Sequence, residues 1–187
     1  LARGVPDEAF DPITGDDRKV ARIWKQRNRR DRQQREAGQL PMVFERRGDD
    51  ALARETAAVL AAPEVTLEDV ERKSAAYGRL HLTSAYRHRI FEADAWCAAF
   101  VLLRSTKWDY PLTDERYWMI VANPDTEYRS WLQDEVVRLA GQYRFLHWHL
   151  TFSHVFRALE PHAIADDDPC GWTGGFDVVL GNPPWEQ

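Results

Sequence analysis

The residues best suited to chemistry stand late in the sequence, where Asn182, Pro183, Pro184 and Trp185 follow one another. Proline fixes its own φ and drives the residue before it into an extended conformation, so the two prolines make this backbone stiff. The amide oxygen of Asn182 and the carbonyl oxygens of such a turn can accept hydrogen bonds from a ligand. Trp185 adds a flat ring for stacking. The tetrapeptide therefore suits a planar group that carries hydrogen-bond donors.

The exocyclic amine of a purine is such a group, and it is a poor nucleophile because its lone pair is delocalised into the ring. Acceptors that hold both amino hydrogens favour a pyramidal nitrogen and the positive charge that develops during attack on an electrophilic methyl group. A base inside a duplex could not reach the tetrapeptide, so it would be flipped out and stacked on Trp185. The pattern predicts methyl transfer to a purine amine.

The elements that must position these residues are predicted as strands. Residues 176–180 are an apolar run that ends at Gly181, which favours a short buried strand. Residues 144–156 are rich in aromatic side chains and favour another strand followed by a turn. A polar residue at the carboxyl end of a buried strand is the usual geometry of an α/β active site. We therefore expect an α/β fold. Asp177, at the entrance of the strand, could orient the catalytic turn, but a residue at that position more often hydrogen-bonds to nearby backbone.

These residues carry a resemblance to a known family. Residues 176–185, Phe-Asp-Val-Val-Leu-Gly-Asn-Pro-Pro-Trp, resemble the catalytic motif of S-adenosylmethionine-dependent, adenine-specific DNA methyltransferases. Residues 145–156 and 171–175 are similar to the approach to this motif in the large methyltransferases of restriction-modification and of the BREX and DISARM phage-defence systems. Residues 5–10 and 15–17 are similar to an interior segment of the same enzymes.

The resemblance implies a fold and a reaction. The fold would be a fragment of a Rossmann-like methyltransferase, with a mainly helical insertion followed by strands of the catalytic sheet. The reaction would transfer a methyl group from S-adenosylmethionine to N6 of a flipped adenine in double-stranded DNA, with Asn182 and Pro183 holding the amine, Pro184 stiffening the turn and Trp185 stacking on the base. Other restriction or defence subunits are the further partners it implies.

The sequence departs from the family in its glycines. The family binds S-adenosylmethionine with a glycine-rich loop, F-x-G-x-G, that follows a strand, whereas this sequence has no G-x-G. Residues 171–175, Gly-Trp-Thr-Gly-Gly, come before a predicted strand. We therefore expect an interior fragment that is inactive alone, with its cofactor loop outside these residues, and no cofactor-binding residue is assigned.

A basic segment is the second candidate site. Residues 17–36 hold nine Lys or Arg against three Asp or Glu, although the chain as a whole has a net charge of −5. We expect a helix with a narrow buried stripe formed by Val20, Ile23 and Trp24. Cations that neutralise phosphates release counterions, which favours DNA binding. The candidate phosphate-contacting residues are Arg22, Lys25, Arg27, Arg29 and Arg30. A solvated helix that balances the acidic remainder is the alternative.

Composition restricts the classes of protein to which this chain can belong. The chain has 187 residues, 44% of them hydrophobic, and a mean hydropathy of −0.57, as in globular proteins. Its longest apolar run, residues 95–103, is too short to cross a bilayer, and no secretion leader is readable, so we expect a cytoplasmic protein. Cys97 and Cys170 form no C-x-x-C pair, which argues against a disulfide framework or a thiolate zinc site; Cys97 is expected to be buried and inert.

Turn residues divide the chain into three predicted sections: an extended segment and basic helix (1–48), a helical insertion (49–142) and the start of the catalytic subdomain (143–187). Within the insertion we expect helices over 50–60, 84–103 and 128–143. A further helix is expected to begin at a capping box formed by Thr66 and Asp69. The residues around Pro111 are expected to form a loop or short helix.

Three alternatives remain open from the residues. Asn182–Trp185 could be a plain turn that ends a strand. The same acceptors would suit an RNA base or a protein glutamine, so a methyltransferase with either substrate is possible, as is a non-catalytic DNA-binding or assembly module that uses the basic segment. A metal site is disfavoured because no pair has zinc-site spacing. The residues considered for it are His147, His149, His154, His162 and Cys170.

Overall fold

The computed structural model describes residues 4–38, 49–107, 111–122, 131–158 and 172–181. Helices make up 67% of this part of the chain. A short 3-10 helix, η1 (Asp7–Phe10), comes first and is followed by the α-helices. These are α1 (Arg18–Glu36), α2 (Asp49–Leu60), α3 (Leu67–Leu82), α4 (Ser84–Val101), α5 (Asp114–Ala122), α6 (Trp131–Tyr143) and α7 (Trp148–Thr151). In the described residues, paired extended backbone is confined to β1 (Arg157–Ala158) and β2 (Trp172–Thr173), which are antiparallel.

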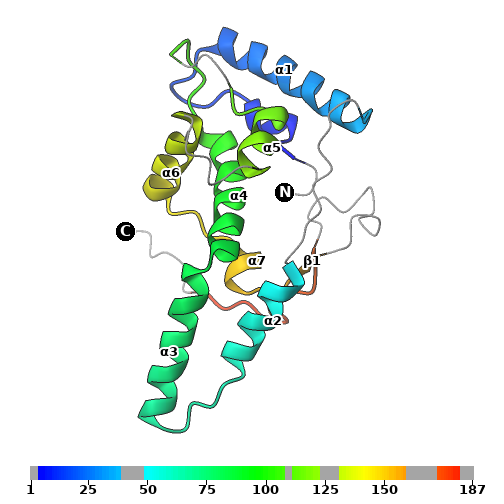
Figure 1. The fold of residues 1–187 in the computed structure, drawn as a ribbon. Helices are drawn as coiled ribbons and strands as arrows, with labels where there is room; N and C mark the ends of the chain where they lie inside the picture. The colour runs from blue at the N-terminus through cyan, green and yellow to red at the C-terminus, as the bar shows by residue number, and fades with distance from the viewer. Residues whose placement is uncertain (1–3, 39–48, 108–110, 123–130, 159–171, 182–187) are drawn as a thin grey trace.

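Helix α4 runs through the middle of the molecule, and the other elements are arranged around its two ends (Figure 1). Around its carboxyl half, η1, α1, α5 and α6 surround a core that includes Trp24, Ala98, Tyr117 and Val136. Around its amino end, α2, α3 and α7 pack a smaller core that includes Leu52, Tyr86 and Leu150. A single helix therefore contributes to both cores, since Ala93 lies in the smaller core and Ala95 in the larger.

The predicted helices are confirmed. Helices α2, α4 and α6 match the expected ranges over 50–60, 84–103 and 128–143, apart from residues 123–130, which lie outside the described residues. The capping box is also confirmed, because the Thr66 hydroxyl accepts from the Asp69 N–H and the Asp69 carboxylate accepts from the Thr66 N–H, both at 3.1 Å. The region around Pro111 leads into α5.

The expected α/β fold, with strands of a Rossmann-like catalytic sheet, is wrong: the described chain is helical. Residues 144–156 form α7 and consecutive turns, in which the N–H groups of Leu150, Phe152 and Phe156 bond to carbonyls three or four residues earlier. Aromatic residues favour strands, but Trp148 and Phe152 are four apart and stack at 5.6 Å, which is helical spacing. Local hydrogen bonding outweighed the strand propensity here.

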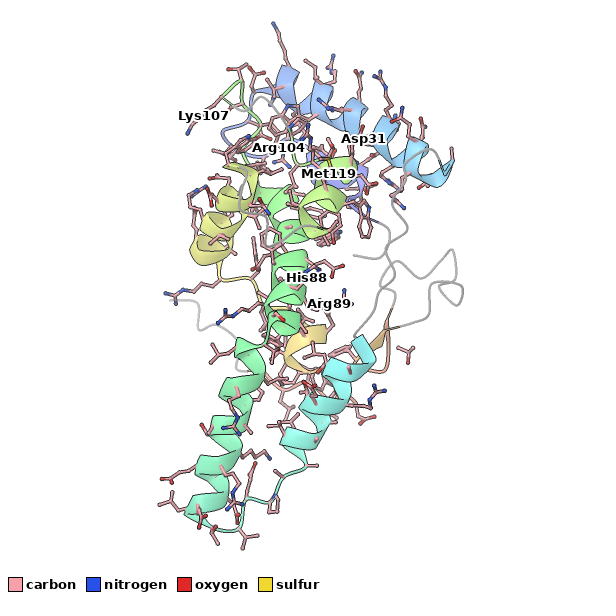
Figure 2. All side chains as sticks on the ribbon, in the orientation of Figure 1. Asp31, His88, Arg89, Arg104, Lys107 and Met119 are labelled. Carbon is pink, nitrogen blue, oxygen red and sulfur yellow. The ribbon has the colours of Figure 1, made fainter. Side chains whose placement is uncertain are left out.

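Buried polar groups hold the amino-terminal residues against the helices. The Arg104 side chain, 1% exposed, donates to the carbonyl oxygens of Ala9, Ala99 and Phe100 and pairs with Asp16 at 3.4 Å. It thereby satisfies carbonyls at the carboxyl end of α4, which have no partner within the helix. Figure 2 shows Arg104 at this end of α4, near α1. None of the described helices combines the length and the apolar character that a bilayer crossing demands.

Candidate functional site

The four predicted catalytic residues, Asn182, Pro183, Pro184 and Trp185, lie outside the described residues. The structure does describe the segment that leads to them, residues 174–181, which we call the approach segment. It follows β2, whose pairing with β1 places Thr173 opposite Arg157. The site is therefore built here from the approach segment and from the basic helix α1.

A glycine turn begins the approach segment. Gly174 has a φ of +89°, a left-handed conformation that side-chain-bearing residues rarely adopt. A Cβ at this position would collide with the backbone carbonyl oxygen of Val155. The sequence needs glycine here because the chain turns sharply while it lies directly against the residues after α7.

Phe176 anchors the approach segment to α7 and the turns after it. Its ring meets those of Trp148, Phe152 and Phe156 edge to face, with centroid distances of 6.0, 5.1 and 5.4 Å. Edge-to-face contacts between aromatic rings stabilise beyond the area that they bury. Phe176 thus holds the approach segment at a point six positions before Asn182.

Beyond Phe176, the approach segment lies on the surface. Val178 is 69% and Leu180 is 92% exposed, and residues 178–181 have no strand partner among the described residues. The predicted buried strand over 176–180 is therefore wrong in this structure. An apolar run favours burial, but a strand also needs a neighbouring strand, which the described chain does not supply. Asp177, expected at the entrance of that strand, is exposed as well.

The cations of helix α1 fall into two groups, according to whether a carboxylate lies beside them. The first group is tied to the fold by carboxylates. Lys25 Nζ lies 2.6 Å from Asp11, and Arg29 Nε lies 3.1 Å from Asp7. Arg35 Nε lies 2.6 Å from the fully buried carboxylate of Asp114. Arg32 lies 3.9 Å from Asp7 and 3.6 Å from Glu36.

The second group consists of exposed cations. Arg22 and Arg30, both predicted phosphate contacts, are exposed, and so are Arg18 and Lys19, which were not predicted. In the described part of the chain none of these four lies within salt-bridge distance of a carboxylate. Arg27 is half-buried and likewise has no such partner there. Figure 2 shows nitrogen-tipped side chains along the side of α1 that faces away from the other helices.

The buried side of α1 differs from the expected stripe. Trp24 is buried as expected, but Ile23 is 61% exposed, and the buried positions include Asn28. The Asn28 side chain donates to the Val5 carbonyl at 3.0 Å and to Asp7 at 2.9 Å, and it accepts from the Asp114 N–H at 2.8 Å. These bonds fix the rotation of α1 about its axis, which decides which cations face outward.

A histidine and a carboxylate join the middle of α4 to the start of α7. His147 Nε2 lies 2.7 Å from Asp94 Oδ1, and the His147 side chain is buried. Cys97, one turn further along α4, is half-buried, and burial followed by the charge of Asp94 raises the pKa of its thiol to about 11. Such a thiol stays protonated at neutral pH, as expected for an unreactive cysteine.

The residues considered for a metal site do not come together as far as the structure describes them. No group of three or more His, Cys, Asp or Glu suited to a metal ion occurs among the described residues. His147 bonds to Asp94, and its ring centroid lies 6.2 Å from that of His149. His154 is exposed. His162 and Cys170 lie outside the described residues.

Gly174 does not offer a place for S-adenosylmethionine. A nucleotide loop leaves space over its glycines so that the ligand can approach the backbone. Gly174 instead lies against the Val155 carbonyl, so that position is already filled by the chain itself. Gly171 lies outside the described residues. We therefore assign no residue of this chain to the methyl donor.

Comparison with known proteins identifies no relative. No family model, no curated protein and no solved structure matches the chain. The exposed cations Arg18 and Lys19 could have been found from the sequence, because they share a helix face with Arg22. The Asp94–His147 contact could not, because its partners are 53 residues apart.

Proposed function

We propose that this chain is part of an S-adenosylmethionine-dependent methyltransferase that modifies N6 of adenine in double-stranded DNA, in restriction-modification or phage defence. The observation that carries the proposal is the order of residues 176–185, in which an apolar run and a glycine lead directly into Asn-Pro-Pro-Trp. The chemistry of those side chains supports it. Asn182 and Pro183 supply acceptors for the amine, Pro184 stiffens the backbone, and Trp185 stacks on the flipped base.

The approach segment supports this assignment through its anchoring. Phe176 packs against three rings, whereas Val178 and Leu180 remain on the surface. An enzyme that takes a base out of a duplex must meet it at its surface. Because residues 178–181 are exposed, the chain reaches Gly181 at the surface, where DNA is accessible.

The reaction assigns a definite task to these residues. S-adenosylmethionine supplies an electrophilic methyl group when bound. The amine of adenine would be the nucleophile that takes up this methyl group, and the task of Asn182 and Pro183 is to hold and orient that amine. Acceptors aimed at the two amino hydrogens stabilise the positive charge that builds on nitrogen, so no strong base is needed. We place this activity in the cytoplasm, with other restriction or defence subunits as partners.

The test is an Asn182→Ala variant of the whole protein. Removing one preorganised hydrogen-bonding group typically lowers turnover by about 100-fold or more. We expect N6-methyladenine formation to fall by that factor while the affinity for DNA changes by less than about 2-fold. The chain offers a matched control in Asn123→Ala, since Asn123 also follows an apolar run and precedes a proline but lacks the second proline and the tryptophan that follow Asn182. Unchanged methylation by Asn182→Ala would contradict the proposal.

A non-catalytic DNA-binding or assembly module is the second candidate. The observation that favours it is the helical architecture of the described chain, together with the exposed cations of α1. One measurement distinguishes the two candidate functions. If the whole protein binds DNA but transfers no label from S-adenosyl-[methyl-3H]methionine to any DNA, RNA or protein substrate, the module is the better description.

A further inference from the structure

The outward side of α1 carries amides between cations. On a helix, residues separated by four or seven positions share a face. Gln26 lies four positions from both Arg22 and Arg30, and Gln33 lies seven positions beyond Gln26; all four side chains are exposed. Lys19, also exposed, is seven positions before Gln26. The centre of the outward side is therefore a row of amides with cations at its sides and at its amino end.

Acidic side chains are rare on this outward side. Between Arg18 and Arg35 the sequence has one acidic residue, Asp31. Asp31 is 5% exposed and lies on the inward side of α1, where Figure 2 labels it. Glu36, at the carboxyl end of α1, lies 3.6 Å from Arg32. In the described residues no carboxylate lies within salt-bridge distance of Arg18, Lys19, Arg22 or Arg30, so an anionic partner would be their first counter-charge.

The dimensions match those of a DNA groove. Arg18 and Arg30 are twelve residues apart, which corresponds to about 18 Å of helix. The major groove of B-DNA is about 12 Å wide and admits an α-helix. Cations spread over that length can reach phosphates on both sides of the groove while the residues between them face the base edges.

The chemistry at the centre of the face favours a nucleic acid over a membrane. A helix that lies on a lipid surface needs a broad apolar face, with cations at its margins. On α1, Ile23 is the one large aliphatic side chain that is strongly exposed. Amide side chains can form paired hydrogen bonds with N6 and N7 of adenine in the major groove. The centre of this face thus suits base edges and does not suit acyl chains.

We propose that α1 docks in the major groove of duplex DNA, with Arg18, Lys19, Arg22 and Arg30 on phosphates and with Gln26 and Gln33 on base edges. Lys25 and Arg29 are held by Asp11 and Asp7 and serve the fold. The proposal rests on the proposed function for its choice of DNA as the partner. It goes further, because it assigns a groove, a register and a separate group of structural cations to one helix.

The first test measures how DNA affinity depends on salt. Each lost phosphate contact lowers the slope of log K against log salt concentration by about 1. For the whole protein we expect the double variant Arg22→Gln/Arg30→Gln to lower the slope by about 2. The double variant Lys25→Gln/Arg29→Gln removes the same charge from the same helix and serves as the matched control, with a change below about 0.5. Equal slopes for the two double variants would overturn the proposal.

The second test measures base preference. Gln26→Ala and Gln33→Ala each remove an amide but no charge, so the salt slope stays the same. We expect each to lower the preference for duplexes with A·T pairs over duplexes of G·C alone by about 5-fold or more. An unchanged preference in both variants would overturn the assignment to base edges. Binding to anionic phosphatidylserine vesicles but not to duplex DNA would overturn the docking itself.

These outcomes are separable from the failure of the proposed function. Asn182→Ala reports on methyl transfer and leaves α1 intact, whereas the α1 variants report on affinity and leave residues 176–185 intact. If Asn182→Ala abolishes methylation and the α1 variants leave affinity unchanged, the methyltransferase assignment stands and this inference fails. If the α1 variants weaken binding as expected and Asn182→Ala methylates normally, the inference stands and the catalytic assignment fails.

Discussion

Asp94 in the middle of α4 and His147 just before α7 are joined across the molecule by a contact of 2.7 Å between Oδ1 and Nε2. His147 is buried, and the two residues are 53 positions apart in the sequence. The contact therefore secures the start of α7, whose following turns in turn anchor Phe176.

Asp94→Ala is expected to destabilise the fold by about 1–3 kcal/mol, because it leaves the buried His147 side chain without its partner. Asp94→Asn keeps an acceptor oxygen at the same position and should cost less than half as much. Urea denaturation followed by circular dichroism measures both. An unchanged denaturation midpoint for Asp94→Ala would show that the contact adds no stability.

The pH dependence of stability should report on Asp7. Burial acts to raise the pKa of Asp7, but the hydrogen bonds from Asn28 and Arg29 and the charge of Arg32 together lower it below the ordinary value of 3.8. The unfolded chain therefore binds this proton more readily than the folded chain does. The stability that Asp7 contributes is fully present above pH 3.8 and is lost as the pH falls through its lower folded pKa.

Asp7→Asn should accordingly flatten the loss of stability below about pH 4 and lower stability at pH 7. Chemical denaturation at a series of pH values tests this. Asp69→Asn is a useful comparison, because hydrogen bonds from Thr66 lower the pKa of this residue in the same direction, at a site remote from α1. If Asp7→Asn leaves the acid limb of the curve unchanged, Asp7 does not couple protons to folding.

Gly174→Ala should disturb the approach segment. The new Cβ would collide with the Val155 backbone, and the left-handed φ adds strain, so we expect a loss of about 1–3 kcal/mol and faster hydrogen exchange over residues 174–181. Gly181→Ala is the matched control, since a Cβ there would meet nothing within 4 Å. Equal exchange rates in the two variants would show that the turn does not hold the approach segment.

The helices could be predicted from the sequence because their signals are local. The capping box at Thr66 and Asp69 joins residues three apart, and the predicted bond forms in both directions. The basic helix over 17–36 was also expected. The rotation of this helix about its axis was not expected, because it depends on the bonds of Asn28 to Val5, Asp7 and Asp114, which lie 23, 21 and 86 positions away in the sequence.

The strands were predicted wrongly because composition does not specify a partner. Residues 144–156 have strand-forming side chains, yet Trp148 and Phe152 are spaced for a helix turn. Residues 176–180 are apolar, yet pairing depends on chain segments distant in sequence. The candidate site could also be predicted only in part. The chemistry of residues 182–185 follows from their types alone. Which cations of α1 are structural and which are exposed depends on the positions of Asp7 and Asp11, which the sequence does not give.

The sharing of α4 between two cores restricts how this protein can change in length. Inserting or deleting one residue within α4 would rotate the elements at one end by about 100° relative to those at the other and would shift them by about 1.5 Å. Ala93 and Ala95 would then no longer face their respective cores together. Insertions during evolution should therefore be tolerated in the connections between helices and selected against between residues 84 and 101.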